Sequence, residues 1–248
     1  MSPKRMWCIG SLQVCRARAR SRTPSTRILS DLAAQRHAAE LDHVLVAVTD
    51  LAAAARAIED EYGLMAEEGG RHPGWGTANC IVPLGDAYLE LVTAVDAAEA
   101  ARSSFGRWVT ASQSGLLRPL GWAVRTEGLD EVASRLGLTI EAGSRTGRDG
   151  QLVRWRLAGV EEAAAEPALP FFIEWAPGTR LPGRPRTAHA TGEVSIAEVR
   201  VRGDPHHIKS WLGTHQVPID IRPGTSAITA VILRSASGDE IVLGTTES

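Results

Sequence analysis

The stretch Leu41-Asp-His-Val-Leu-Val-Ala-Val48 predicts a β-strand, and the residues directly after it predict a helix. Alternation places the strand's side chains on two faces, the first with Leu41, His43, Leu45 and Ala47, the second with Val44, Val46 and Val48. Asp50 stands where an N-cap is expected, and Gly63 stands where a helix typically ends. Between them, five residues recur at helical spacing: Leu51, Ala54, Ala55, Ile58 and Tyr62.

Three further strands are expected after this helix. A short strand is predicted near Leu64–Glu67, and a glycine-rich loop covers Gly69–Gly76. Two longer strands, Thr77–Leu84 and Ala87–Ala94, are joined by the Gly85-Asp86 turn, and their close spacing is typical of a hairpin. The order of elements from Leu41 to Ala94 is therefore β-α-β-β-β.

The same order of elements recurs twice further along the chain. The second copy opens at Leu120 and has its helix at Leu129–Leu136, and the third opens at Glu193, after a stretch rich in Pro, Gly and Arg. We therefore predict an α+β fold of tandem βαβββ modules. The expected domains are a disordered Arg-rich tail at 1–40, module 1 with a connecting helix at 41–118, module 2 at 119–176, a linker at 177–192 and module 3 at 193–248.

The composition is that of a globular protein. Of the 248 residues, 44% are hydrophobic and 23% are charged, and the net charge of −2 gives no global reason to expect nucleic acid or membrane as a partner. No run approaches the ~20 apolar residues of a membrane-spanning helix. The three cysteines show no disulfide or zinc spacing, so we expect a reducing, cytoplasmic compartment.

The first 40 residues differ from the rest, because they carry eight basic residues against two acidic ones. They contain no sustained apolar run of the kind a secretory signal needs. The favoured interpretation is a disordered tail with no role in the fold. An organellar transit peptide, a nucleic-acid-binding arm and a start codon assigned too far upstream are the alternatives.

Three motifs carry a resemblance to a known superfamily. They are Leu41-Asp-His43 on the first strand, Tyr88-Leu-Glu-Leu91 on the fourth, and Gly70-Arg-His-Pro-Gly-Trp-Gly-Thr-Ala-Asn79 between them. With the repeated β-α-β-β-β order, the chain resembles the vicinal oxygen chelate superfamily (glyoxalase, bleomycin-resistance and extradiol-dioxygenase proteins), in its glyoxalase-like subgroup. The resemblance implies that modules 1 and 2 pair around a U-shaped sheet cleft, with module 3 as a C-terminal addition.

The resemblance also implies a metal site, because ligands in this superfamily come from the first and fourth strands of each module. Carried over by position, the ligands are His43, Glu90 and Glu174, with Gly121 at the place of the missing fourth. One imidazole and two carboxylates suit Mn²⁺, Fe²⁺, Ni²⁺ or Zn²⁺ and leave positions open for a bidentate oxygen substrate. The alternative for His43 is a histidine that is hydrogen-bonded at a strand start.

The residues themselves single out the two acids. Glu90 lies in Tyr88-Leu-Glu-Leu-Val92 and Glu174 in Phe171-Phe-Ile-Glu-Trp175, and both segments are apolar on both faces. A carboxylate buried in such a strand needs a partner, which points to a functional site. The alternative for each is a carboxylate on a solvated face. A carboxylate on a metal ion can also leave it and act as a base, which makes Glu174 a catalytic candidate.

The glycine-rich loop supplies the remaining candidates. Arg71 suits a carboxylate or phosphate, Trp75 suits an apolar group, and Asn79 completes a substrate-binding cluster at the cleft mouth. His72 is the candidate acid or base. The alternative is a hairpin connection that happens to hold an aromatic anchor.

Taken with the resemblance, these residues imply a glyoxalase-like small-molecule enzyme. It would depend on a divalent metal, act on a substrate with vicinal oxygens, and be of lyase, isomerase or ring-cleaving dioxygenase type. The alternative is a non-catalytic protein that binds or sequesters a small molecule, as in bleomycin resistance, and the missing ligand at Gly121 favours it. The sheet of module 3 is expected to pack on the first two modules or on the same module of a second chain, in a homodimer.

Overall fold

The computed structural model describes residues 41–115, 117–146, 150–184 and 188–244. The predicted tail at 1–40 lies outside these residues, as do 185–187 of the predicted linker and 245–248 of module 3. In chain order the elements are β1 (Leu41–Ala47), α2 (Leu51–Tyr62), β2 (Glu67–His72), β3 (Thr77–Leu84), β4 (Ala87–Ala94), α3 (Ala97–Ala100), α4 (Ser104–Ser112), β5 (Pro119–Arg125), α5 (Leu129–Leu136), β6 (Ile140–Thr146), β7 (Leu152–Ala158), α6 (Val160–Ala165), β8 (Phe171–Trp175), β9 (Val194–Gly203), α7 (Pro205–Leu212), β10 (Ile219–Pro223), β11 (Ala227–Ser235) and β12 (Glu240–Gly244).

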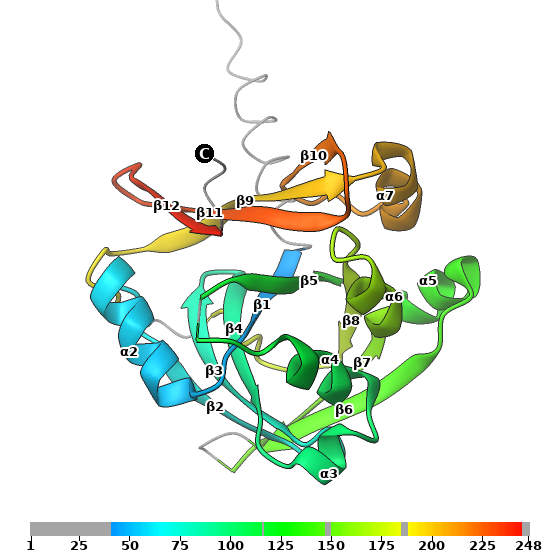
Figure 1. Cartoon of the computed structure of the whole chain (residues 1–248), viewed down its shortest axis with the longest axis horizontal. Coiled ribbons are helices and arrows are strands. Elements are labelled where there is room, and N and C mark those ends of the chain that lie inside the picture. The colour runs from blue at the N-terminus through cyan, green and yellow to red at the C-terminus, as the bar shows by residue number, and fades with distance from the viewer. Residues whose placement is uncertain (1–40, 116, 147–149, 185–187, 245–248) are drawn as a thin grey trace, which may run out of the picture.

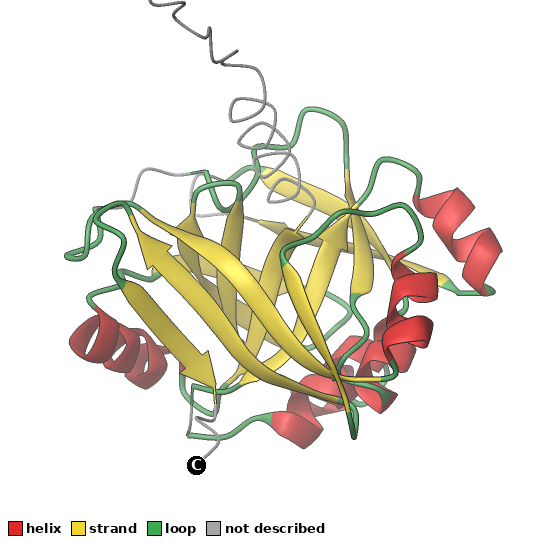
Figure 2. Cartoon of the chain, turned by 90° about the horizontal axis from the view of Figure 1, so that it is seen from above, coloured by secondary structure: helices red, strands yellow, loops and turns green. Residues whose placement is uncertain are grey.

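Modules 1 and 2 together form one eight-stranded sheet, in the order β2-β3-β4-β1-β5-β8-β7-β6. In each module the first strand pairs in parallel with the fourth, β1 with β4 and β5 with β8. β1 and β5 lie antiparallel at the centre of the sheet. Figure 2 shows the strands curling around a common interior. The predicted α+β fold, with two modules around a U-shaped sheet, is confirmed.

The helix caps predicted from the sequence form as expected. The side chain of Asp50 accepts a hydrogen bond from the backbone N–H of Ala53 at 2.9 Å, and Gly63 ends α2 with a φ of 66°. The single connecting helix expected within 96–118 is instead two short helices, α3 and α4. The helix α6, between β7 and β8, was not predicted.

β1 divides its side chains between two cores. Val44 and Val46 belong to the outer core, under α2 and the second sheet, while Leu45 belongs to the inner core inside the curled sheet. Leu41 also lies in the outer core, contrary to the expectation that it shares a face with His43. The reason is a register shift against β5 between these two residues.

Module 3 forms a separate four-stranded sheet, in the order β10-β9-β11-β12. Its elements follow the predicted β-α-β-β-β order, but β9 pairs in parallel with β10 and antiparallel with β11 rather than pairing with the fourth strand. Figure 1 shows this sheet lying across the main sheet. Val199 and Val201 of β9 share the outer core with Leu89 and Leu91 of β4. The sheet of module 3 therefore packs on the first two modules, which was one of the two expected arrangements. The homodimer stays a prediction.

The segment predicted as a linker is attached to module 1 through His189. This side chain is buried, its Nδ1 accepts a hydrogen bond from the N–H of Met65 at 2.9 Å, and its Nε2 lies 2.7 Å from the carbonyl oxygen of Pro83. The N–H of Ala190 also donates to the carbonyl oxygen of Gly63 at 2.9 Å. No helix within the described residues is long and apolar enough to span a membrane.

Replacing His189 by Ala should lower the free energy of unfolding by about 2 kcal/mol, because it leaves the half-buried N–H of Met65 and the buried carbonyl of Pro83 without their partner. Urea unfolding followed by tryptophan fluorescence measures this loss. His206→Ala is the control, since His206 is exposed at the start of α7 and its loss should cost less than about 0.5 kcal/mol. Equal stability of the two variants would show that His189 does not fasten the segment.

Candidate functional site

Glu90 lies at the centre of a polar cluster inside the curled sheet. It projects from β4 and is 6% exposed. Its Oε1 accepts a hydrogen bond from Asn79 Nδ2 at 2.8 Å, and its Oε2 lies 3.4 Å from His43 Nε2. His72 Nε2 lies 3.9 Å from Oε1. The fold therefore directs two imidazoles and one amide at a single buried carboxylate.

Asp42 sets the orientation of the His43 ring. Its Oδ1 lies 2.7 Å from His43 Nδ1, and its Oδ2 accepts hydrogen bonds from Trp175 Nε1 at 2.8 Å and Arg125 Nη1 at 3.2 Å. A carboxylate accepts, so Nδ1 of His43 carries the proton in this contact. In the neutral ring, Nε2 then presents a lone pair to the Glu90 carboxylate. Two acceptors face each other at 3.4 Å, an arrangement that a proton or a cation between them would stabilise.

His72 is a second buried imidazole with one nitrogen engaged. Its Nδ1 lies 2.8 Å from Thr77 Oγ1. Burial lowers the pKa of His72 to about 4, although the neighbouring Glu90 carboxylate acts in the opposite direction. The ring is therefore neutral at pH 7 and is a weaker base than a free imidazole.

Asn79 reaches Glu90 because β2 carries a glycine beside it. A Cβ on Gly69 would lie 1.9 Å from Asn79 Oδ1, so any larger residue there would displace the amide. The same Oδ1 is buried and has no hydrogen-bond partner among the described residues. The glycine leaves room for the amide, and the Glu90 carboxylate, which only accepts, sets Nδ2 as the atom that faces it.

Aromatic side chains surround this cluster. The ring of His43 stacks on Tyr88 with 4.7 Å between centroids. The remaining space is a cavity of about 20 Å³, whose aromatic walls are Trp75, Tyr88, Phe105, Trp155, Phe171 and Trp175. A cavity of this size holds about one water molecule. Burial in this wall raises the pKa of Tyr88 well above its usual value.

Module 2 has no counterpart of the His43–Glu90 pair. On β1 and β4, Glu90 pairs with Leu45, two residues after His43. On β5 and β8, Phe171 pairs with Ala123, two residues after Gly121. Phe171 therefore occupies the place that corresponds to Glu90. A Cβ on Gly121 would lie 2.3 Å from Trp108, so the other ligand position is covered by an indole ring.

Glu174 lies on the other face of β8. Its carboxylate is ion-paired with Arg156 and accepts a hydrogen bond from the N–H of Leu129 at 3.3 Å, at the start of α5. Arg156 also pairs with Asp130 at 2.8 Å. These contacts stabilise α5 against the sheet. The structure therefore does not bring Glu174 to His43 and Glu90, either as a ligand or as a base.

Five of the residues expected at the site do meet there: His43, His72, Trp75, Asn79 and Glu90. Arg71 does not, because its side chain on β2 is exposed and does not line the cavity. Within the described residues, no three His, Cys, Asp or Glu side chains are grouped closely enough to hold a metal ion as they stand. The closest approach to such a group is the pair His43 and Glu90, with His72 beyond it.

Two functional residues had no signal in the sequence. Asp42 was read only as part of the opening triplet, and its partners Arg125 and Trp175 lie 83 and 133 residues away. Arg145 lies near the end of β6 and lines the cavity, and its guanidinium donates to the carbonyl oxygen of Gly69 on β2. Asp42 is next to His43 in the sequence, and closure of the sheet brings Arg125 and Trp175 to Asp42 and Arg145 to the cavity.

Comparisons with known proteins agree with this fold. A sequence model described as a glyoxalase-like domain matches residues 41–216. A hypothetical protein from Staphylococcus aureus superposes with a TM-score of 0.61 at 15% identity, covering 82% of this chain and 98% of that one. Methylmalonyl-CoA epimerase from Mycobacterium tuberculosis gives a TM-score of 0.40 at 20% identity, covering 56% of this chain and 89% of that one. None of the curated proteins matches the chain. The family match and the superposition on the Staphylococcus aureus protein describe the fold and not the reaction.

Proposed function

The chain belongs to the glyoxalase-like domain family, within the vicinal oxygen chelate superfamily, and from this premise we propose that it is a metal-dependent small-molecule enzyme. The observation that carries the proposal is the buried Glu90 carboxylate facing His43 Nε2 at 3.4 Å, with the opposite nitrogen of His43 held by Asp42. A carboxylate behind a histidine is the usual support of a metal-binding imidazole.

The residues present fit a divalent cation in the type and direction of their donors. His43 and Glu90 would hold it. A cation there would relieve the contact between the Nε2 lone pair and the carboxylate. With few protein ligands, several positions stay open for substrate, which suits Mn²⁺, Fe²⁺, Ni²⁺ or Zn²⁺.

The proposed chemistry is proton transfer next to a pair of substrate oxygens. When bound, the cation would polarise vicinal oxygens and stabilise the enolate-like anion that forms. His72, neutral and buried, accepts the proton at Nε2 while Thr77 holds its Nδ1. Glu90 lies beside His72 and stabilises the imidazolium. This chemistry belongs to lyases and isomerases more than to ring-cleaving oxygenases.

Hydrogen–deuterium exchange tests the proposal without knowledge of the complete reaction. Protein reconstituted with each of the four cations should exchange the proton next to a carbonyl in small 2-oxo acids and hydroxyketones in D₂O. The same protein treated with a chelator should lose this exchange, by at least about a hundredfold. Proton NMR measures the rates. Glu174→Gln is the control and should exchange at the wild-type rate. A reconstituted wild type without metal or exchange would contradict the proposal.

One observation favours the second candidate function, a binding protein that sequesters its ligand. The module 2 half of the site is apolar, because Phe171 and Trp108 stand where ligands would be. Six aromatic rings around a small cavity suit the capture of an apolar group. A ligand that binds and is recovered unchanged after long incubation would favour this function. In either case we propose a reducing, cytoplasmic location, because the spacing of the three cysteines is not that of a disulfide framework.

A further inference from the structure

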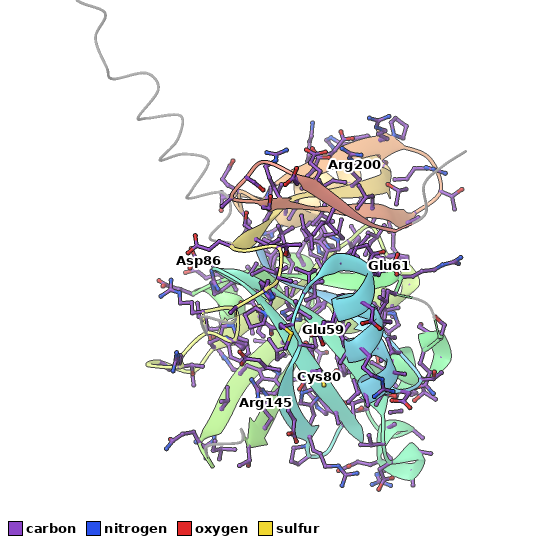
Figure 3. The ribbon with its side chains drawn as sticks, turned by 90° about the vertical axis from the view of Figure 1, so that its left-hand side faces the viewer. Glu59, Glu61, Cys80, Asp86, Arg145 and Arg200 are labelled. Carbon is purple, nitrogen blue, oxygen red and sulfur yellow. The ribbon has the colours of Figure 1, made fainter. Side chains whose placement is uncertain are left out.

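Arg145 lies between the inner cavity and a larger pocket, the outer pocket, at the open side of the curled sheet. The outer pocket has a volume of about 700 Å³ and is lined by β2, β7 and the segment Ala176–Pro182. Among the described residues, only Arg145 lines both the inner cavity and this outer pocket. Figure 3 shows Arg145 on the main sheet, at the far end of the molecule from Arg200 on the second sheet.

The inner cavity is too small for a whole metabolite. Its volume of about 20 Å³ accommodates one water-sized group, whereas small-molecule sites typically measure about 300–1,000 Å³. The outer pocket falls within that range. A substrate that reacts beside Glu90 must therefore place most of its atoms in the outer pocket, and the group nearest to the cavity would lie against Arg145.

The guanidinium of Arg145 is available to an anion. Its hydrogen bond to a described residue goes to the carbonyl oxygen of Gly69, and no carboxylate within the described residues forms an ion pair with it. Burial is the main reason that the pKa of His72 is lowered and that of Tyr88 is raised. The positive charge of Arg145 adds to the first shift and opposes the second, so it is felt inside the inner cavity. A half-buried guanidinium with remaining N–H donors binds carboxylates and phosphates in a bidentate manner.

The outer pocket adds further positive charge. Arg154 on β7 and Arg180 in the segment after β8 both line it and are exposed, while Glu67 and Glu68 line the side formed by β2. The positive charges outnumber the negative ones, and Arg145 is the cation closest to the reactive cluster. Electrostatics thus favour an anionic guest whose acid group points inward.

We propose that the substrate is a small anionic molecule whose carboxylate or phosphate group is bound by Arg145, at the junction of the outer pocket and the cavity that contains Glu90. This proposal rests on the proposed function, because it assumes that the chemistry occurs at Glu90. It adds the class of substrate and the residue that recognises it. The competing role for Arg145 is purely structural, as a clamp between the edge strands β2 and β6.

Binding of matched charged and neutral probes separates these two roles. The probes are pyruvate, its neutral methyl ester, oxalate and inorganic phosphate, titrated at constant ionic strength and followed by calorimetry. Wild type should bind pyruvate or oxalate more tightly than the ester by at least about tenfold. Phosphate binding stronger than that of both carboxylates would identify a phosphorylated substrate instead of a carboxylic acid.

Arg145→Gln should reduce this preference for the anion at least about tenfold while leaving the binding of the ester unchanged, and Arg145→Lys should restore part of it. Arg71→Gln is the control, because Arg71 is an exposed arginine on β2 that lines neither hollow. Circular dichroism checks folding. If Arg145→Gln does not fold, Arg154→Gln at the exposed end of the pocket should still weaken anion binding by about twofold or threefold.

Several outcomes would overturn the assignment of Arg145. They are equal binding of pyruvate and its ester by wild type, no binding of any anionic probe, wild-type anion binding by a folded Arg145→Gln, or an equal loss in Arg71→Gln. Failure of the proposed function looks different. It would leave anion binding dependent on Arg145, while the metal content and exchange activity do not depend on Glu90.

Discussion

Glu90→Gln should lose bound divalent metal by at least about tenfold and lose proton exchange with it, while the protein stays folded. The substitution keeps the shape of the side chain and removes its charge. In the structure, Glu90 Oε2 lies 3.4 Å from His43 Nε2. The amide of the variant can still face Asn79, but it offers no carboxylate oxygen to His43. Removing outer partners of metal ligands typically costs about 10–100-fold in affinity, and removing a ligand should cost at least as much. Elemental analysis after reconstitution and dialysis measures the loss.

Two further variants make this result specific. His72→Gln should keep most of the metal and lose exchange, because His72 is proposed to move the proton and is the more distant donor at 3.9 Å from Glu90. Glu174→Gln should keep both, because Glu174 pairs with Arg156 on the other face of β8. The proposed site would be contradicted by a Glu90→Gln protein that is more stable than wild type and has the same metal content. Glu90 would then be a buried acid without a cation.

Trp211→Ala should lower the free energy of unfolding by about 3–5 kcal/mol, the largest stability effect that we expect from one side chain. Trp211 lies on α7 and is 7% exposed, with its ring 6.3 Å from that of Phe172 in module 2. Its Nε1 donates to the carbonyl oxygen of Pro170 at 2.8 Å. The substitution therefore creates a cavity between modules 2 and 3 and leaves a buried carbonyl unpaired.

Urea denaturation followed by circular dichroism measures this effect. Lys209→Ala is the matched control, because Lys209 lies on the same helix but is exposed, and its loss should cost less than about 0.5 kcal/mol. We expect one transition, since the outer core is shared between the two sheets. A loss below about 1 kcal/mol, or a first transition that leaves the eight-stranded sheet intact, would show that module 3 is an independent domain.

The order of elements could be predicted from the sequence because its signals are local. Asp50 and Gly63 cap α2 with contacts to residues in the same turn, and the Gly85-Asp86 turn pairs the two strands beside it. The pairing of His43 with Glu90 was predictable through the resemblance, since the first and fourth strands of such a module are parallel neighbours. The sequence also assigned His72, Trp75 and Asn79 to a substrate-binding cluster at the cleft mouth, and in the structure all three line the cavity with this pair.

The face on which Glu174 lies was decided by the tertiary structure. Successive side chains of a strand point to opposite faces, so a shift of one residue exchanges the two. Phe171-Phe-Ile-Glu-Trp175 is apolar on both faces and has no alternation from which to choose. Pairing with β5 sends Phe171 inward with Trp175, and Glu174 outward to Arg156.

Asp42, Arg145 and His189 depend on contacts between distant parts of the chain. Asp42 bonds Trp175 across 133 residues, Arg145 bonds Gly69 across 76, and His189 bonds Met65 across 124. Nothing near these residues in sequence indicates such partners, because the partners meet only when the two modules close and the segment after β8 folds back. The sequence by itself thus determined the repeated module and the acid with its first imidazole. Closure of the sheet decided that Arg125 and Trp175 hold the Asp42 carboxylate behind that imidazole, that Glu174 lies outside the site, and that Arg145 lines the cavity.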